Sequence, residues 1–182
     1  MSANAAAARA PSAVTIRPLT VADASALKAC RVAGLQETPE AFLSTAAEIE
    51  ATPVAQFEAE LADADIRYAG AFDGEGLVGF MRTVRFSRRA RRHVAEVRSV
   101  VVRASHRRQG IADRLLSHLI AQARDSGIEA LLLTVVAGNL PARRLYEQAG
   151  FTVYGIEPCA VRRDGVDEDQ LLMRLALQAP GP

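Results

Sequence analysis

A short basic turn near the middle of the chain holds the residues whose types and spacing best suit the binding of a phosphate. Arg107 and Arg108 carry fixed positive charge, and Gly110 allows the backbone to approach a ligand closely. The turn lacks the G-x-x-x-x-G-K-[ST] pattern of nucleotide triphosphatases and the G-x-G-x-x-G fingerprint of dinucleotide-binding proteins. We therefore predict a cradle for a phosphate-bearing ligand of another kind.

The segments on either side of this turn predict a strand that leads into a helix. Residues 94–102 are mostly apolar, and Ile111, Leu115 and Leu119 recur at every fourth position after the turn. A helix that begins here presents unpaired backbone N–H groups and the positive end of its dipole to a ligand. An ordinary strand–turn–helix with a solvated basic turn is the alternative interpretation.

A second strand and helix follow in the C-terminal half. Residues 128–136 form a short apolar run bounded by glycines, which is typical of a buried strand. Asn139 suits a helix N-cap, Pro141 the first turn and Gly150 a C-terminal stop. These residues predict a helix over roughly 139–150.

Two motifs in these segments resemble the signatures of the GNAT superfamily of N-acetyltransferases. The turn reads R-x-x-G-x-A from Arg107 to Ala112, which is similar to the coenzyme A turn of that superfamily. The second helix carries N-x-x-A-x-x-L-Y-x-x-x-G-F from Asn139 to Phe151, which resembles its other and more specific signature. The resemblance covers roughly residues 14–177. It implies a single-domain α/β (α+β) fold, with a central mixed, twisted β-sheet of about seven strands flanked by helices.

The resemblance also implies an activity. The expected reaction moves an acetyl group from acetyl-CoA to a primary amine by direct attack in a ternary complex, without a covalent acyl-enzyme. By the same resemblance, the backbone of Val100 and Val102 binds the pantetheine arm, and the Val100 N–H faces the thioester oxygen. Such a donor contributes about 3 kcal/mol to lowering the barrier. The residues expected to bind acetyl-CoA are Val100, Val101, Val102, Arg107, Arg108, Gln109, Gly110, Ile111, Ala112, Asn139 and Tyr146.

Glu96 is the expected catalytic base. Its offset from Arg107 resembles that of the catalytic glutamate in the histone-acetyltransferase branch of the superfamily. Another branch places its glutamate on the next strand, where this chain has Thr134, which cannot act as a base. Glu96, Arg98, Val100 and Val102 share one face if the strand is regular, but the resemblance implies that a bulge often occurs here. A carboxylate that is merely paired with Arg98 or another arginine is the alternative interpretation of Glu96.

Tyr146 is the expected catalytic acid. It lies in the second signature, where relatives place a phenol near the coenzyme sulfur. A phenol with a pKa of about 10 can reprotonate a thiolate whose thiol has a pKa of about 8.5. The alternative is a core tyrosine whose hydroxyl is satisfied by the protein.

Composition agrees with one enzyme domain. The chain has 182 residues, of which 49% are hydrophobic, so it can bury one substantial core. We expect a disordered tail over 1–12, the GNAT-like domain over 13–177 and a short tail over 178–182. The two cysteines are too few for a disulfide framework, which makes a reduced, cytoplasmic setting the simplest interpretation. The three histidines lack metal-ligand spacing, so no metal site is expected.

Other elements complete the expected order β-α-α-β-β-β-α-β-α-β-β. Further strands are predicted at 14–17, 67–72, 77–86, 151–160 and 168–177, and further helices at 21–37 and 54–62. The resemblance implies that the acceptor contacts segment 21–62 and the last hairpin. Glu37, Glu40, Glu48 and Glu50 in that segment suit a polyamine or peptide amine, or form a solvated acidic face.

Two rival functions remain open. One is a non-catalytic acyl-CoA-binding regulatory module on the same fold, against which the presence of both Glu96 and Tyr146 speaks. The other is a nucleic-acid-binding protein that uses the arginines of 88–92. A net charge of +1 disfavours nucleic acid as a partner. No apolar run approaches the length that crosses a membrane, so no membrane partner is expected. The expected partner is an amine-bearing small molecule or peptide, and a homodimer is possible because dimers are common among relatives.

Overall fold

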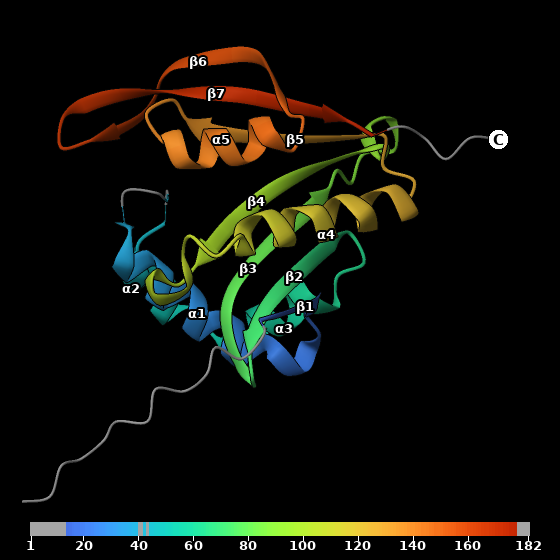
Figure 1. Cartoon of the computed structure of the whole chain (residues 1–182), viewed down its shortest axis with the longest axis vertical. Helices are drawn as coiled ribbons and strands as arrows, with labels where there is room; N and C mark the ends of the chain where they lie inside the picture. The colour runs from blue at the N-terminus through green and yellow to red at the C-terminus, as the bar shows by residue number, and fades with distance from the viewer. Residues whose placement is uncertain (1–13, 40–41, 43, 178–182) are drawn as a thin grey trace, which may run out of the picture.

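One seven-stranded sheet organises the computed structural model, which describes residues 14–39, 42 and 44–177. Its strands are β1 (Thr15–Pro18), β2 (Ile66–Asp73), β3 (Gly76–Arg85), β4 (Val94–Val102), β5 (Ala130–Val136), β6 (Thr152–Arg163) and β7 (Val166–Ala176). The order across the sheet is β1-β2-β3-β4-β5-β7-β6 (Figure 1). Neighbours β4 and β5 are parallel and the other pairs are antiparallel. The predicted mixed sheet is confirmed.

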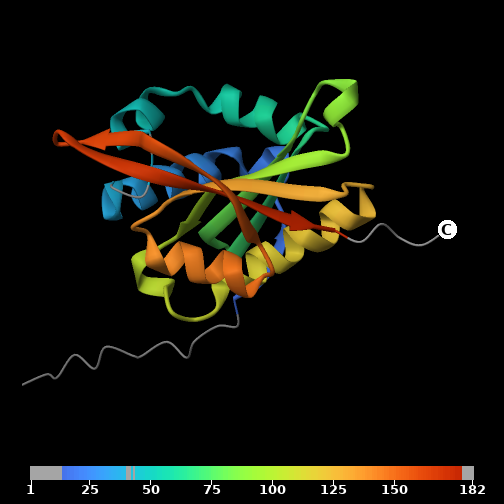
Figure 2. The same cartoon turned by 90° about the horizontal axis from the view of Figure 1, so that it is seen from above.

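Helices cover both faces of this sheet, as the two views together show (Figures 1 and 2). The helices α1 (Ala24–Glu37), α2 (Ala46–Ala51) and α3 (Val54–Ala62) lie on one face. The other face carries α4 (Ile111–Asp125) and α5 (Leu140–Gln148). Short 3-10 turns occur at Val21–Asp23, Arg89–Arg91 and Ala104–His106.

Two clusters of apolar side chains hold the helices to the sheet. The apolar stripe of α4 is fully buried against the sheet together with α5, as its four-residue spacing predicts. The opposite cluster packs α1 and α3 against β2, β3 and β4. Its buried residues include Leu27 of α1, Phe57 of α3 and Phe80 of β3. The sheet is therefore a central layer between two helical layers.

The predicted elements agree with the structure in their order, with one helix missed. That helix is α2, a six-residue element with a single buried side chain, Ile49, so its sequence has almost no apolar periodicity. Its start was nevertheless marked by a capping box, in which Thr45 and Glu48 each bond the other's backbone N–H. The helix expected from residue 21 begins with a 3-10 turn, and the strand expected from 128 begins at Ala130. Strands β6 and β7 both run closer to their connecting turn than predicted.

Parts of the expected domain boundaries lie outside the described residues, namely the tails over 1–12 and 178–182. Within the described part, no helix combines the length and the apolar character needed to cross a membrane.

Candidate functional site

Strands β4 and β5 pair over a short stretch and then separate. Their register joins Val94 to Ala130, Ala95 to Leu131 and Glu96 to Leu132, and there the pairing ends. β5 remains paired with β7 along its whole length, from Ala130 to Val136. Figure 1 shows the two strands diverging towards the N-terminus of α4. The edge of β4 that faces β5 is thus left without a partner strand after Glu96 in the described part of the chain.

A β-bulge changes which residues of β4 share a face. Arg82 opposes Arg98 and Phe80 opposes Val101, so Ser99 and Val100 together lie opposite one residue of β3. Ser99 adopts a φ of 53°, in the left-handed region. Because of this extra residue, Val100 and Val102 pack with the core under α4 and α5, while Val101 joins the core under α1. The strand is therefore not regular, and the bulged alternative holds: Glu96 and Arg98 lie on one face, and Val100 and Val102 on the other.

The backbone of the last β4 residues points its polar groups into the separation. Arg103 N donates to Val78 O at 2.9 Å, which fixes the direction of that N–H towards β3. Successive N–H groups of a strand point to opposite edges of the strand. The N–H of Val102 therefore points away from β3, and so does the N–H of Val100. Val100 and Val102 are the residues that the resemblance implied for the pantetheine arm, and that contact stays a prediction.

The turn after β4 presents backbone N–H groups to its surroundings. Gly110 adopts a φ of 69° and forms the N-cap position of α4. The first helical bond runs from Arg114 N to Gly110 O at 3.1 Å. The N–H groups of the first three helical residues, Ile111, Ala112 and Asp113, have no acceptor within the described part of the chain.

Gly110 is required by its conformation and its openness rather than by packing. A Cβ built on it meets no heavy atom of the described residues within 4 Å. Its neighbours Arg108 and Gln109 are exposed, and Arg108 also has a positive φ of 60°. The turn is therefore an open surface of N–H groups beside the guanidinium of Arg108, which has no partner among the described residues, and this arrangement suits an anion.

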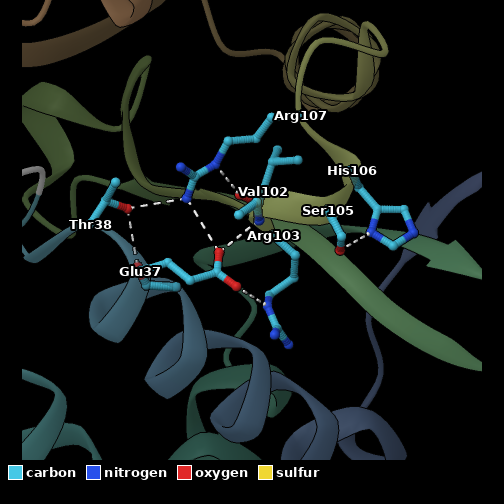
Figure 3. A network of polar contacts seen from close by, with 9 residues as sticks. Glu37, Thr38, Val102, Arg103, Ser105, His106 and Arg107 are labelled. Atoms are coloured by element: carbon cyan, nitrogen blue, oxygen red, sulfur yellow. Dashed lines mark hydrogen bonds and ion pairs between the residues drawn. The ribbon is translucent and has the colours of Figure 1, made fainter.

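The two arginines of the turn differ in role. Arg107 Nε donates to Val102 O at 3.0 Å, and its Nη2 donates to Glu37 and to Thr38 Oγ1, each at 3.3 Å. These bonds tie its guanidinium to the end of β4 and the end of α1 (Figure 3). Arg107 thus positions the turn, whereas Arg108 bonds no residue in the described part of the chain.

Glu37, at the C-terminus of α1, is a residue of the site that sequence reasoning missed in this role. Arg103 Nε donates to its Oε1 at 2.8 Å, and Ala104 N donates to its Oε2 at 2.7 Å (Figure 3). Burial alone would raise the pKa of Glu37, but the bonds from Arg103 and Ala104 outweigh it and hold that pKa below its ordinary value. Its partners lie some 66 residues away in sequence, so no local pattern marked it.

The four glutamates that suited an amine acceptor, Glu37, Glu40, Glu48 and Glu50, do not all remain available for one. Glu37 is committed to the turn, and Glu48 bonds the backbone N–H of Thr45 in the cap of α2. Glu40 lies outside the described residues. Two of the four carboxylates therefore already have structural partners.

Glu96 lies at the point where β4 and β5 part. Arg98 donates to its Oε2 through Nε, at 2.8 Å, and through Nη2. The Glu96 side chain is 20% exposed and that of Arg98 is 49% exposed. The structure thus shows the pairing with Arg98 that was the alternative interpretation, and it also shows the carboxylate at the vertex of the separation. Thr134 lies on β5, two residues beyond Leu132, the last residue of β5 that pairs with β4.

Tyr146 is buried in the core on the α4 and α5 side, at 6% exposure. Its ring meets that of Phe151 edge-on, with centroids 5.8 Å apart. Burial raises the pKa of Tyr146 to about 12. Its hydroxyl has no hydrogen-bond partner among the described residues.

Asn139 occupies the predicted N-cap of α5, which is confirmed. Its side-chain oxygen accepts from Ala142 N at 3.2 Å, and Pro141 lies in the first turn. The helix ends before Gly150, which has a φ of 93°. The cap therefore sets the start of α5 immediately after β5, on the far side of the separation from β4.

Comparisons with known proteins agree with this geometry. The model described as the Acetyltransferase (GNAT) family matches residues 33–151. A Bacillus subtilis protein named as an uncharacterized N-acetyltransferase, YsnE, is 33% identical over 105 residues, which cover 53% of this chain and 67% of that protein. In two further curated matches the alignment spans 31% and 29% of the other protein.

Solved structures share the fold. An acetyltransferase of the GNAT family from Streptococcus pneumoniae superposes with a TM-score of 0.76 at 24% identity, covering 90% of this chain and 99% of that chain. The yncA protein from Salmonella typhimurium, a putative acetyltransferase solved with its cofactor acetyl-CoA, has a TM-score of 0.76 at 24% identity. That match covers 93% of this chain and 96% of the other.

Proposed function

Because the chain belongs to the GNAT family of acetyltransferases, we propose that it transfers the acetyl group of acetyl-CoA to a primary amine by direct attack. The observation that carries this proposal is the separation of β4 from β5 beyond Glu96, which runs directly into the open turn at the start of α4. A strand edge followed by free helix N–H groups suits a ligand with an amide-bearing arm and a phosphate end.

Binding of acetyl-CoA in this proposal uses the backbone more than side chains. The N–H of Val102 bonds the pantetheine arm as a neighbouring strand would, and the N–H of Val100 faces the thioester oxygen. The pyrophosphate meets the N–H groups at the start of α4, with the charge of Arg108 beside them. Asn139 meets the coenzyme from the other side while it caps α5.

The proposed chemistry forms a C–N bond and breaks the C–S bond of the thioester. The amine attacks the carbonyl carbon, and its proton passes to Glu96. The negative charge that develops on the carbonyl oxygen is stabilised by the Val100 N–H. The departing thiolate takes a proton from the Tyr146 hydroxyl, which is protonated at neutral pH because burial raises its pKa to about 12. The cycle closes when Glu96 gives its proton to solvent and the Tyr146 oxygen takes one back.

Replacing the turn glycine tests the binding site. Gly110→Glu places a side chain and a negative charge where the pyrophosphate approaches the backbone, at a position whose Cβ meets no described heavy atom within 4 Å and whose positive φ adds a conformational cost. We expect loss of measurable acetyl-CoA binding by calorimetry, with a circular-dichroism spectrum like that of the parent. An unchanged affinity would refute the assignment of the turn.

Gly127→Glu is the matched control. Gly127 follows the other end of α4 and has a φ of 68°, and a Cβ there also meets no described heavy atom within 4 Å. It carries the same conformational cost, so its acetyl-CoA affinity should remain that of the parent. An acceptor screen with detection of the released thiol then separates the enzyme from a regulatory module, since a module binds acetyl-CoA and releases no thiol with any amine.

A further inference from the structure

Three arginines from three elements lie on the sheet face that α1 and α3 cover. Arg82 of β3 and Arg98 of β4 are direct cross-strand partners. Arg82 shares its face with Phe80, which is fully buried in the core under α1. Arg31 of α1 lies one turn after the fully buried Leu27, on the side of the helix that faces the sheet. We call Arg31, Arg82 and Arg98 the arginine cluster.

Packing at α1 indicates the direction of Arg31. Gly34, three residues later, lies so close to β4 that an added Cβ would be 2.5 Å from a methyl group of Val101. Residues three and four apart share one side of a helix, so Arg31 projects towards the same strands as Gly34.

Two carboxylates partly neutralise the arginine cluster. Glu60 of α3 accepts from Arg82 Nη1 at 2.5 Å and from the Tyr68 hydroxyl at 2.6 Å. Glu96 accepts from Arg98. Arg31 forms no hydrogen bond or ion pair with any residue that the structure describes. Three guanidiniums thus face two carboxylates, and one positive charge is left over.

Unused hydrogen-bond donors accompany this excess charge. The Nε of Arg82 is buried and has no hydrogen-bond partner among the described residues. Burial and the nearby charge of Arg82 both lower the pKa of Arg31, against the smaller opposite effects of Tyr68 and Glu60. A buried donor or charge without a partner costs free energy that a bound anion can offset. Guanidiniums bind carboxylates in a two-bonded geometry, which makes a carboxylate the natural ligand.

The arginine cluster adjoins the point of reaction in the proposed function. Arg98 is two residues beyond Glu96 on the same face, in the part of β4 that no longer pairs with β5. An anion held there places a nearby amine next to Glu96. The same anion competes for Arg98, which leaves the Glu96 carboxylate free to accept the proton of the amine.

We propose that the arginine cluster binds an anionic group of the acceptor, so that the acceptor is a small amine that also carries a carboxylate, as an amino acid does. The inference rests on the proposed acetyltransferase function and narrows its acceptor. The inference argues against a polyamine as the acceptor, because the arginine cluster repels its positive charges.

Matched acceptors test the carboxylate directly. The probes are L-leucine, L-phenylalanine and L-glutamate, each beside its α-carboxamide, with spermidine as the cationic amine and thiol release as the readout. The amine of an amide loses its proton more readily, so intrinsic reactivity alone favours the amides. We expect at least one free acid to exceed its amide in kcat/KM by about 10- to 100-fold, the usual loss for a charged hydrogen bond.

Arg31→Gln tests the cluster, with Arg89→Gln as the control, because Arg89 is an exposed arginine in the turn between β3 and β4. For Arg31→Gln we expect KM for the free acid to rise about 10-fold or more, with KM for the amide unchanged. Its melting temperature without amine should equal or exceed that of the parent, since a half-buried unpaired charge is removed. A purely structural arginine would lower the melting temperature and affect acid and amide alike, and that result would overturn the proposal.

The outcomes separate this inference from the function on which it rests. Equal turnover of acids and amides, or a preference for spermidine, overturns the inference and leaves the acetyltransferase intact. Failure to bind acetyl-CoA overturns both. If acetyl-CoA binds and no probe is turned over, titration of the same acids and amides into the coenzyme A complex decides, because binding independent of the carboxylate overturns the inference.

Discussion

The two side chains proposed for proton transfer meet opposite surroundings. Tyr146 lies in an apolar core, where burial raises its pKa to about 12, so the phenol keeps its proton at any working pH. Glu96 lies at the vertex of the strand separation and accepts hydrogen bonds from a guanidinium. Desolvation therefore keeps the phenol protonated, while Glu96 is the last residue of β4 that pairs with β5.

Glu96→Gln separates a base from a scaffold. The amide keeps the shape of the side chain and cannot take a proton, so kcat near neutrality should fall by about 10²- to 10⁴-fold. Activity should partly recover at high pH, where the free form of an amine with a pKa of about 10.4 becomes abundant. Acetyl-CoA affinity should be unchanged. The exposed Glu58→Gln on α3 is the control, and identical pH profiles for the Glu96 variant and the parent would contradict the role.

Tyr146→Phe tests the acid. The ring and its contact with Phe151 remain, so stability should change little, while kcat should fall by about 10²- to 10⁴-fold. With an acyl donor whose leaving thiol is less basic, the same variant should lose less of its kcat. Because the pKa lies at about 12, the parent should show no loss of this acid below about pH 11. Tyr154→Phe, at an exposed tyrosine of β6, should behave as the parent. Full turnover in the Tyr146 variant would return that residue to a packing role.

At the scale of elements, the end of α1 holds the end of β4 in place. Glu37 bonds the backbone of Ala104 and the side chain of Arg103, and Arg107 joins Val102 to Glu37. A strand end, a helix end and a turn far apart in sequence thus share one carboxylate (Figure 3). The turn owes its shape to this long-range contact as well as to its own glycine.

Glu37→Ala removes that contact without touching the ligand surface. We expect faster amide hydrogen exchange over residues 104–110 and an acetyl-CoA affinity lower by about 10-fold, since a charged hydrogen bond contributes about 1.5–3 kcal/mol. Glu48→Ala is the control, because Glu48 caps only α2. Unchanged exchange over the turn in the Glu37 variant would show that Gly110 and the helix start set its shape alone.

At the scale of the molecule, two helical layers leave the sheet open between β4 and β5. The cores lie on opposite faces, and the sheet is continuous across the two strands only from Val94 to Glu96. A ligand that bridges the separated strands adds contacts that the unliganded protein lacks, and it binds the folded state alone.

Acetyl-CoA should therefore raise the melting temperature. At a free concentration of about 100 times Kd, the stabilisation is about 2.7 kcal/mol, which corresponds to about 5–10 °C for a domain of this size. Thermal unfolding followed by circular dichroism checks this, with Gly110→Glu as the variant that should show no shift. An equal shift in both proteins would place the coenzyme elsewhere.

The sequence by itself determined the elements with strong local signals. Strand β4 occupies the predicted 94–102, α3 the predicted 54–62, and α5 starts after its predicted cap Asn139. Helix α4 begins at Ile111 after Gly110, as its apolar spacing indicated. Helix caps, glycine stops and apolar periods depend on residues close together in the sequence, so they can be recognised without knowledge of the fold.

Tertiary structure alone decided how these elements combine into a site. The bulge at Ser99 depends on the register with β3, and it moves Val100 and Val102 off the face of Glu96. Arg103 meets Glu37 across 66 residues, and Arg82 meets Glu60 across 22. Such contacts depend on how layers stack, and side chains of this kind have no periodicity of their own. Two carboxylates of the acidic run, Glu37 and Glu48, are engaged in the clamp on β4 and in the cap of α2, while Arg98 bonds Glu96.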